Sequence, residues 1–270
     1  MIVETYRGLA FRYGIDASRV PAPLATRFVG LGLDASTKAW IDDSIANPHG
    51  KAQMAARALA AKVMSDYDAN ALLGTHDMRV LGRAQWQRFV GGRAKGRLLD
   101  VGAGDGHVTR ELAPLFDSVV TTELSTRMAE RLRKQGYVCH TIDVADEPLP
   151  EPGRFDAIAL LNVIDRTSRP FTMLERLRDL LADDGFLVVA VPLPLRPHVH
   201  VGAKTVDPDE LLPVDRRSFE HAAATLVEVA FAGLGLVVDA WTRVPYLSRG
   251  DGTVAAFTLD DAVFVLSKRA

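Results

Sequence analysis

Two patterns of hydrophobic and polar positions divide the chain near residue 90. Residues 1–90 show helix-period spacing without strand-like runs, and 51–64 holds helix-favouring side chains throughout. A short helix is expected at 83–89, where Gly91-Gly92 would end it. We therefore predict a helical N-terminal extension, or lid, over residues 1–92.

From residue 93 onward, short apolar runs alternate with helical patterns. The runs are typical of buried strands and lie at 96–102, 118–124, 137–144, 155–163, 186–191, 236–244 and 262–266. Helices are predicted at 107–114, 126–135, 170–182 and 217–233. Ser125 is expected to cap the second of these helices and Gly136 to end it. Because such alternation favours right-handed crossovers, we predict an α/β fold. Its Rossmann-like, seven-stranded, mostly parallel sheet would carry helices on both faces, within a domain over residues 93–270.

One connection is too long and irregular for an ordinary crossover. Residues 192–216 are rich in proline, and loops of this length in a compact domain are usually functional. We predict that this segment is a substrate loop.

Composition and charge narrow the possible functions. The 270 residues are 48% hydrophobic and 24% charged with a net charge of −2, which argues against a nucleic-acid partner. The single cysteine, Cys139, excludes an internal disulfide and a cysteine-based metal cluster. No apolar run is long enough to span a membrane, and the first residues lack a signal peptide's apolar block. The expected location is the cytoplasm.

A glycine-rich loop is the sharpest chemical signal. Gly102, Gly104 and Gly106 follow a predicted strand and open a predicted helix, as in nucleotide-binding loops. Glu123 ends the next strand, where a carboxylate reaches both hydroxyls of a ribose. Asp143, at the end of the third strand, could accept a hydrogen bond from an adenine amino group.

The position of Asp100 helps to distinguish between the possible cofactors. A carboxylate just before the loop repels a pyrophosphate but suits the cationic amino-acid part of S-adenosylmethionine (SAM). NAD binding or a purely structural turn are the alternatives. We predict SAM as cofactor and S-adenosylhomocysteine as product, with Leu124 and Asn162 as further cofactor contacts.

The chain resembles the seven-stranded SAM-dependent methyltransferases and, within them, the DREV or methyltransferase-like nine family. The matching blocks follow family order: LLDVGAGDGHVT (98–109), TELS (122–125), LNVIDR (161–166), RPFTML (169–174), PLPLRPHV (192–199), TRVPYL (242–247) and LDDAVFVL (259–266). The glycine loop is generic to methyltransferases, whereas the 161–166 block and the two C-terminal blocks are more specific. The resemblance implies methylation of a peptide or protein histidine at the ring nitrogen nearer the backbone (N-pros), in His-x-His sequences with a small middle residue.

Methyl transfer to imidazole requires a neutral ring held in one tautomer. A carboxylate bonded to the far ring N–H would select that tautomer and stabilise the imidazolium as it forms. Asp165 is our candidate, because it follows the fourth strand at the carboxyl edge of the sheet. The family's matching Asp contacts the target histidine. Alternatively, Asp165 caps the helix at 170–182 or pairs with Arg166. Asn162, three residues earlier, could orient cofactor or acceptor.

Four other residues are predicted to contact the acceptor. Tyr246 could line a peptide groove or donate its hydroxyl, or could be a packing aromatic. Arg196 and His198 lie in the predicted substrate loop. Phe257 stands where the family has a tyrosine, a departure that removes a hydroxyl from the expected substrate geometry.

His198-Val199-His200 is itself a His-x-His sequence, so a metal pair is conceivable. With no acidic partner nearby in the sequence, we predict no metal. Self-methylation at this sequence is only a side possibility, because valine is bulky for the middle position.

Other functions remain open, namely a small-molecule N-methyltransferase acting on a free imidazole or amine, and a non-catalytic binding module. A nucleic-acid methyltransferase is disfavoured by the near-neutral charge and by LNVID in place of an Asn/Asp-Pro-Pro-Tyr/Phe motif.

Overall fold

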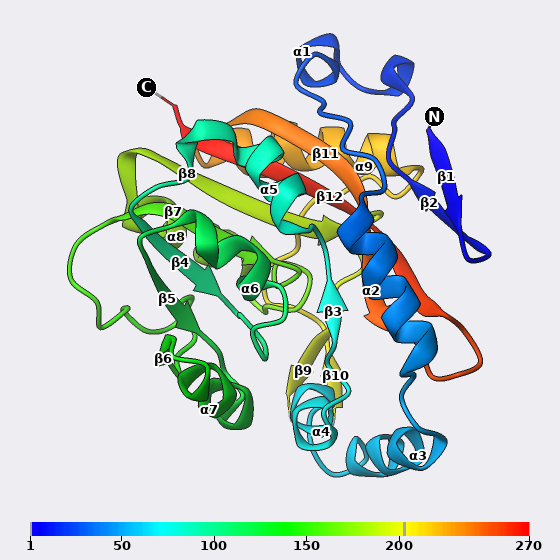
Figure 1. Cartoon of the computed structure of the whole chain (residues 1–270). Helices are drawn as coiled ribbons and strands as arrows, with labels where there is room; N and C mark the ends of the chain where they lie inside the picture. Colours follow the sequence, from blue (N-terminus) through cyan, green and yellow to red (C-terminus); the bar gives the residue numbers. More distant parts are fainter. Residues whose placement is uncertain (1, 202–203, 270) are drawn as a thin grey trace.

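A single mixed sheet forms the centre of the computed structural model, which describes residues 2–201 and 204–269 (Figure 1). Its strand order is β3-β11-β12-β8-β7-β4-β5-β6. The eight strands are β3 (Met78–Arg79), β4 (Arg97–Val101), β5 (Ser118–Thr122), β6 (Val138–His140), β7 (Phe155–Leu161), β8 (Leu181–Pro192), β11 (Leu236–Arg249) and β12 (Ala256–Lys268). From β8 to β6 neighbouring strands are parallel, whereas β12, β11 and β3 pair antiparallel. The predicted α/β fold with a mostly parallel sheet is confirmed.

Helices cover both faces of this sheet. The α-helices of the described residues are α1 (Ala22–Ala25), α2 (Ala35–Ala46), α3 (Lys51–Ala60), α4 (Asp66–Leu73), α5 (Arg83–Val90), α6 (Thr109–Leu112), α7 (Thr126–Lys134), α8 (Pro170–Leu180) and α9 (Phe219–Thr225), of which α3 and α4 lie beyond the edge of the sheet. One core cluster joins α2, α5 and α6 to the sheet, and the other joins α8 and α9 to its opposite face. Along β7, Ala157 and Ala159 face the first cluster while Ile158 and Leu160 face the second. Burial on both faces explains why this strand is an apolar run without alternation.

The N-terminal region contains strands, so the prediction of none in residues 1–90 is wrong. β1 (Val3–Tyr6) and β2 (Leu9–Arg12) form a hairpin joined by Arg7 and Gly8, both with positive φ. Two-residue hairpin turns are usually recognised in a sequence by Asn-Gly or Asp-Gly. Here arginine stands at the first turn position, so the turn was not predicted. β3 adds to the main sheet beside β11, which raises the strand number from seven to eight.

Several element boundaries also differ from prediction. The third strand ends at His140, so Asp143 lies in the following loop. The helix expected at 217–233 is α9 followed by a π-helical turn at Leu226–Phe231. Ser125 occupies the N-cap of α7, but its hydroxyl donates to Asp68 instead of accepting from the helix. The strands β8, β11 and β12 are longer than expected because they continue past their apolar centres.

The long connection after β8 carries its own short hairpin. β9 (Val199–Val201) pairs with β10 (Lys204–Val206) and lies next to α4 at the lower edge of the molecule in Figure 1. The rings of Tyr67 and His200 meet edge-on, 5.7 Å apart, and confirm this proximity. Among the described residues, none of the helices combines the length and apolar character needed to cross a membrane.

Candidate active site

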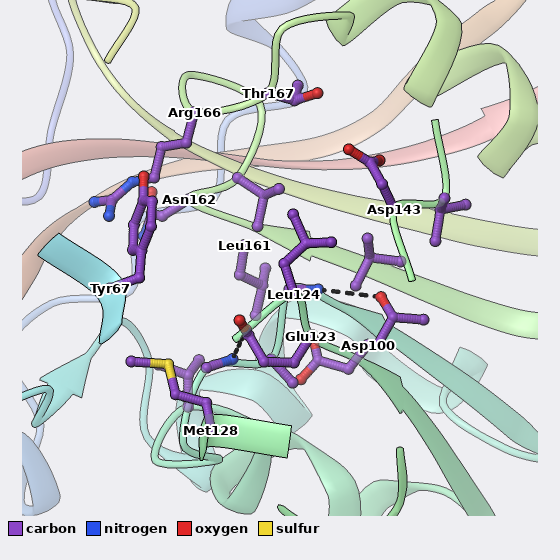
Figure 2. A pocket seen from close by; sticks show the side chains of 18 of the residues that line it. Tyr67, Asp100, Glu123, Leu124, Met128, Asp143, Leu161, Asn162, Arg166 and Thr167 are labelled. Atoms are coloured by element: carbon purple, nitrogen blue, oxygen red, sulfur yellow. Dashed lines mark hydrogen bonds between the residues drawn. The ribbon is translucent and has the colours of Figure 1, made fainter. Parts of the chain in front are cut away.

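A cavity of about 310 Å³ lies at the carboxyl ends of β4, β5 and β7. The chain places β5 and β6 on one side of β4 and then returns to place β7 on the other, so the cavity occupies a topological switch point. Open α/β sheets bind their ligands at this point, in cavities of roughly 300–1,000 Å³. Figure 2 shows Tyr67, Asn162 and Arg166 at one end of the cavity and Asp143 at the other.

The glycine loop brings backbone close to both sides of the cavity. Gly102, Gly104 and Gly106 have φ values of +68°, +60° and +86°, in the left-handed region that favours glycine. A Cβ at Gly104 would lie 2.8 Å from the His76 ring, and one at Gly102 2.6 Å from the Val163 side chain. Any other residue here would be strained and would push these walls apart.

Glu123 closes the loop from the end of β5. Its Oε2 accepts the Gly104 N–H at 2.9 Å, and its Oε1 accepts the Ser125 N–H at 2.8 Å. Burial raises the pKa of Glu123, and these two backbone donors oppose the rise. Each carboxylate oxygen keeps a second lone pair, so Glu123 can still accept two ligand hydroxyls.

Asp100 lies beneath the loop and is 2% exposed. It accepts a 2.6 Å hydrogen bond from the Thr109 hydroxyl. Burial raises the pKa of Asp100 to about 7, and the charge of Glu123 adds to the rise while Thr109 opposes it. A cationic ligand would stabilise the ionised form, which matches the role predicted for this residue.

The other end of the cavity is lined by Asn162, Arg166, Tyr67 and Tyr246. Asn162 follows β7 with a φ of +59°, held by its N–H on the Ala190 carbonyl. The Arg166 guanidinium lies over the Tyr67 ring, 5.7 Å from its centre. Burial raises the pKa of Tyr246, so its hydroxyl stays protonated and can donate.

Asp165 is buried behind this end, at 7% exposure, and is not part of the cavity lining itself. Its Oδ1 has no hydrogen-bond partner among the described residues. Arg166 Nε lies 3.8 Å from its Oδ2, a long separation for an ion pair. The N-cap of α8 is Arg169, so Asp165 does not cap that helix. Burial raises the pKa of Asp165, and Arg166 opposes the rise.

Comparison with known proteins gives the family of this chain. The family model described as DREV methyltransferase matches residues 13–268. The chain belongs to the DREV methyltransferase family. It is therefore a SAM-dependent methyltransferase, as its glycine loop and Glu123 indicate.

Solved structures of other methyltransferases are similar to this chain at low sequence identity. The 1,6-didemethyltoxoflavin-N1-methyltransferase of Burkholderia thailandensis, with bound 1,6-didemethyltoxoflavin and S-adenosylhomocysteine, is 18% identical with a TM-score of 0.52, over 80% of this chain and 91% of that one. N-methyltransferase NodS from Bradyrhizobium japonicum WM9, in complex with S-adenosylhomocysteine, is 14% identical with a TM-score of 0.45, over 70% and 86% of the two chains.

The predicted cofactor residues of this DREV methyltransferase gather around one cavity. Its lining includes Asp100, Gly102, Gly104, Glu123, Leu124, Asp143 and Asn162. Gly106 is not in that lining, and its φ instead permits the turn that leads into α6. Asp143 faces the cavity while its Oδ1 accepts the Ala145 N–H at 2.8 Å.

The predicted acceptor residues are more scattered. Tyr246 lines the cavity, whereas Arg196 and His198 are exposed on the 192–216 segment outside it. The His198 N–H donates to the Asp165 carbonyl at 2.7 Å, which connects that segment to the site. Phe257 is 46% exposed on β12 and lies outside the lining, so its predicted substrate contact would belong to an outer surface.

Sequence reasoning missed several lining residues. Tyr67, His76 and Met78 come from the N-terminal region, and no motif marks them. Asp261 lies outside the lining, in the LDDAVFVL block, and is fully buried next to Asn162; burial raises the pKa of Asp261 well above its ordinary value, and Asn162 opposes the rise. Its position in a specific block was the available signal.

The affinity for SAM should depend on pH through Asp100. With a pKa of about 7 in the ligand-free protein, Asp100 is largely neutral below pH 7 and must ionise to attract a cation. We therefore expect the Kd for SAM to rise about tenfold from pH 8 to pH 6, because one proton is released on binding. Calorimetry in buffers of different ionisation enthalpy measures both quantities. If the Kd of the Asp100→Asn variant depended on pH to the same extent, the effect would belong to titrating groups of SAM and not to Asp100.

Proposed function

We propose that this methyltransferase transfers the SAM methyl group to the N-pros nitrogen of a histidine in a peptide or protein that contains a His-x-His-like sequence. The observation that carries the proposal is the buried Asp165 carboxylate, which lies behind the end of the cavity lined by Asn162, Arg166, Tyr67 and Tyr246 (the acceptor end) and whose Oδ1 has no hydrogen-bond partner among the described residues. A neutral imidazole offers one lone pair for methylation and one N–H for such a carboxylate.

The cofactor end of the cavity fits SAM. Glu123 would accept the ribose hydroxyls, Asp100 would face the cationic amino-acid part, and Asp143 would receive the adenine amino group. SAM supplies a methyl group on a sulfonium, which a nucleophile takes by in-line displacement. A Cβ at Gly102 or Gly104 would collide with Val163 or His76, two residues that line this cavity.

The protein's task at the acceptor end is alignment and tautomer selection. Asp165 would accept the far ring N–H, so that the N-pros lone pair faces the methyl group. As the ring becomes an imidazolium, the same carboxylate stabilises the new positive charge, and the proton is later lost to solvent. The positive charge of the imidazolium also favours the ionised form of Asp165, whereas burial favours the neutral form. Tyr246 and Asn162 would position the ring, and the buried walls exclude water.

Peptide labelling tests the proposal. Peptides with His-Ala-His, Ala-Ala-His and Ala-Ala-Ala cores are incubated with labelled SAM, and the products are mapped by mass spectrometry. We expect transfer only to the histidine-containing peptides, strongest for His-Ala-His, with the methyl group on the N-pros nitrogen. Labelling of free imidazoles or amines in place of every peptide would overturn the proposal in favour of a small-molecule N-methyltransferase.

A further inference from the structure

Two histidines and an aspartate converge at the rim of the cavity. The Nε2 atoms of His198 and His200 lie 2.8 Å apart, and His200 Nε2 lies 3.8 Å from Asp66 Oδ2. One ligand atom from each residue lies within 4.8 Å of the other two. The sequence offered no acidic partner for the His-x-His pair, and the fold supplies one from the first turn of α4, more than a hundred residues away.

These separations bracket those of a zinc site. Zinc holds nitrogen and oxygen ligands at about 2.0–2.2 Å in a tetrahedron, which places ligand atoms roughly 3.3–3.6 Å apart. The two separations that involve His200 Nε2, 2.8 Å and 3.8 Å, therefore lie one on each side of this spacing, and side-chain rotation would have to bring His198 and Asp66, which lie within 4.8 Å, to the same spacing. Two imidazoles and one carboxylate also form a donor set that zinc uses, with one position left for water or another ligand.

A neighbouring arginine orients one of the three side chains, and the cluster is open to solvent. Arg57 Nη2 lies 3.1 Å from Asp66 Oδ1, which orients the carboxylate and leaves Oδ2 toward the histidines. Such outer partners are a regular part of metal sites. The His200 side chain is 8% exposed, whereas Asp66 is 36% exposed and His198 lies at the surface. An ion can therefore enter from the solvent side.

We propose that Asp66, His198 and His200 bind one divalent transition-metal ion, with zinc as the best match. The ion would connect α4 to β9, the two segments that bring Tyr67 and His200 to the rim of the cavity. Binding of the ion stabilises this arrangement and couples it to Asp165, whose carbonyl accepts the His198 N–H. The proposal of a metal site rests on these three side chains and not on the identity of the methyl acceptor.

Zinc itself is the probe. Metal-free full-length protein, prepared with a chelator, is titrated with Zn²⁺ by calorimetry, and bound metal is counted by native mass spectrometry. We expect one ion per chain. His198→Ala and Asp66→Asn should each weaken binding by at least the 10- to 100-fold that loss of an outer-shell partner typically costs. Zinc should also slow hydrogen exchange in residues 65–73 and 199–201 of the wild-type chain only.

His221→Ala is the matched control, because this histidine lies on α9 and bonds Ser218, outside the cluster. It should bind zinc as the wild type does. Circular dichroism of each metal-free variant checks folding, and the exposed position of His198 makes its variant the least disruptive. A chain that takes up no stoichiometric zinc, or that binds it equally well after both substitutions, would overturn the site.

Discussion

Asp165→Asn is expected to reduce turnover by about 10³- to 10⁴-fold while the Kd for SAM changes less than twofold. The magnitude follows from triad aspartates that orient a histidine, where the amide selects the wrong tautomer. Asp165 lies behind the acceptor end and does not line the cofactor end, so cofactor binding should persist. Single-turnover rates with the histidine peptide, together with calorimetry for SAM, measure the two quantities separately.

Asp184→Asn provides the control, because Asp184 is an exposed aspartate near the start of β8, at the opposite end of the strand from the cavity. Its turnover should match the wild type. Asp165→Ala should lose activity to a similar degree, because both substitutions remove the charged acceptor. If either Asp165 variant retains wild-type turnover, the carboxylate does not select the tautomer, and the acceptor must be oriented by another group. A parallel loss of SAM affinity would instead indicate a structural role.

The sheet was predictable because its strands are marked locally. Residues 155–161 are apolar throughout since β7 is buried on both faces, and glycine or proline interrupts the chain near most strand ends. β3 was not predictable, because two residues, Met78 and Arg79, carry no periodicity. They pair with β11 only because the main sheet already offers Leu247 and Ser248 as partners. Tertiary context therefore decides such a strand.

The same contrast applies to the site. Asp100 lies in β4, and the glycines and Glu123 follow the ends of β4 and β5 within the next 25 residues, so their pattern could be recognised from spacing alone. Tyr67 and Asp66 reach the cavity rim from a helix whose sequence shows only ordinary capping by Ser65. Their contacts with Arg166 and His200 join segments about 100 residues apart or more. No periodic pattern in the sequence predicts these contacts, because they depend on where the fold places α4.

Glu123 holds the glycine loop in place and is proposed also to bind the cofactor ribose. Its carboxylate accepts the Gly104 and Ser125 N–H groups, which fixes the glycine loop against the end of β5. The second lone pair on each oxygen is then free for the ribose hydroxyls. Removing the side chain therefore removes ligand contacts and also loosens the loop. Glu123→Gln keeps one acceptor oxygen and should lose less than Glu123→Ala.

Glu123→Ala is expected to weaken SAM binding by about 1.5–3 kcal/mol, roughly 10- to 150-fold in Kd, which is the value of a hydrogen bond to a charged group. Because the proposed contact is to ribose, calorimetry should give a similar loss for S-adenosylhomocysteine, which lacks the sulfonium charge. Glu130→Ala, an exposed glutamate on α7, should bind both ligands normally. A loss seen with SAM alone would place Glu123 near the methyl-bearing sulfur, and unchanged affinity for both would remove it from the cofactor site.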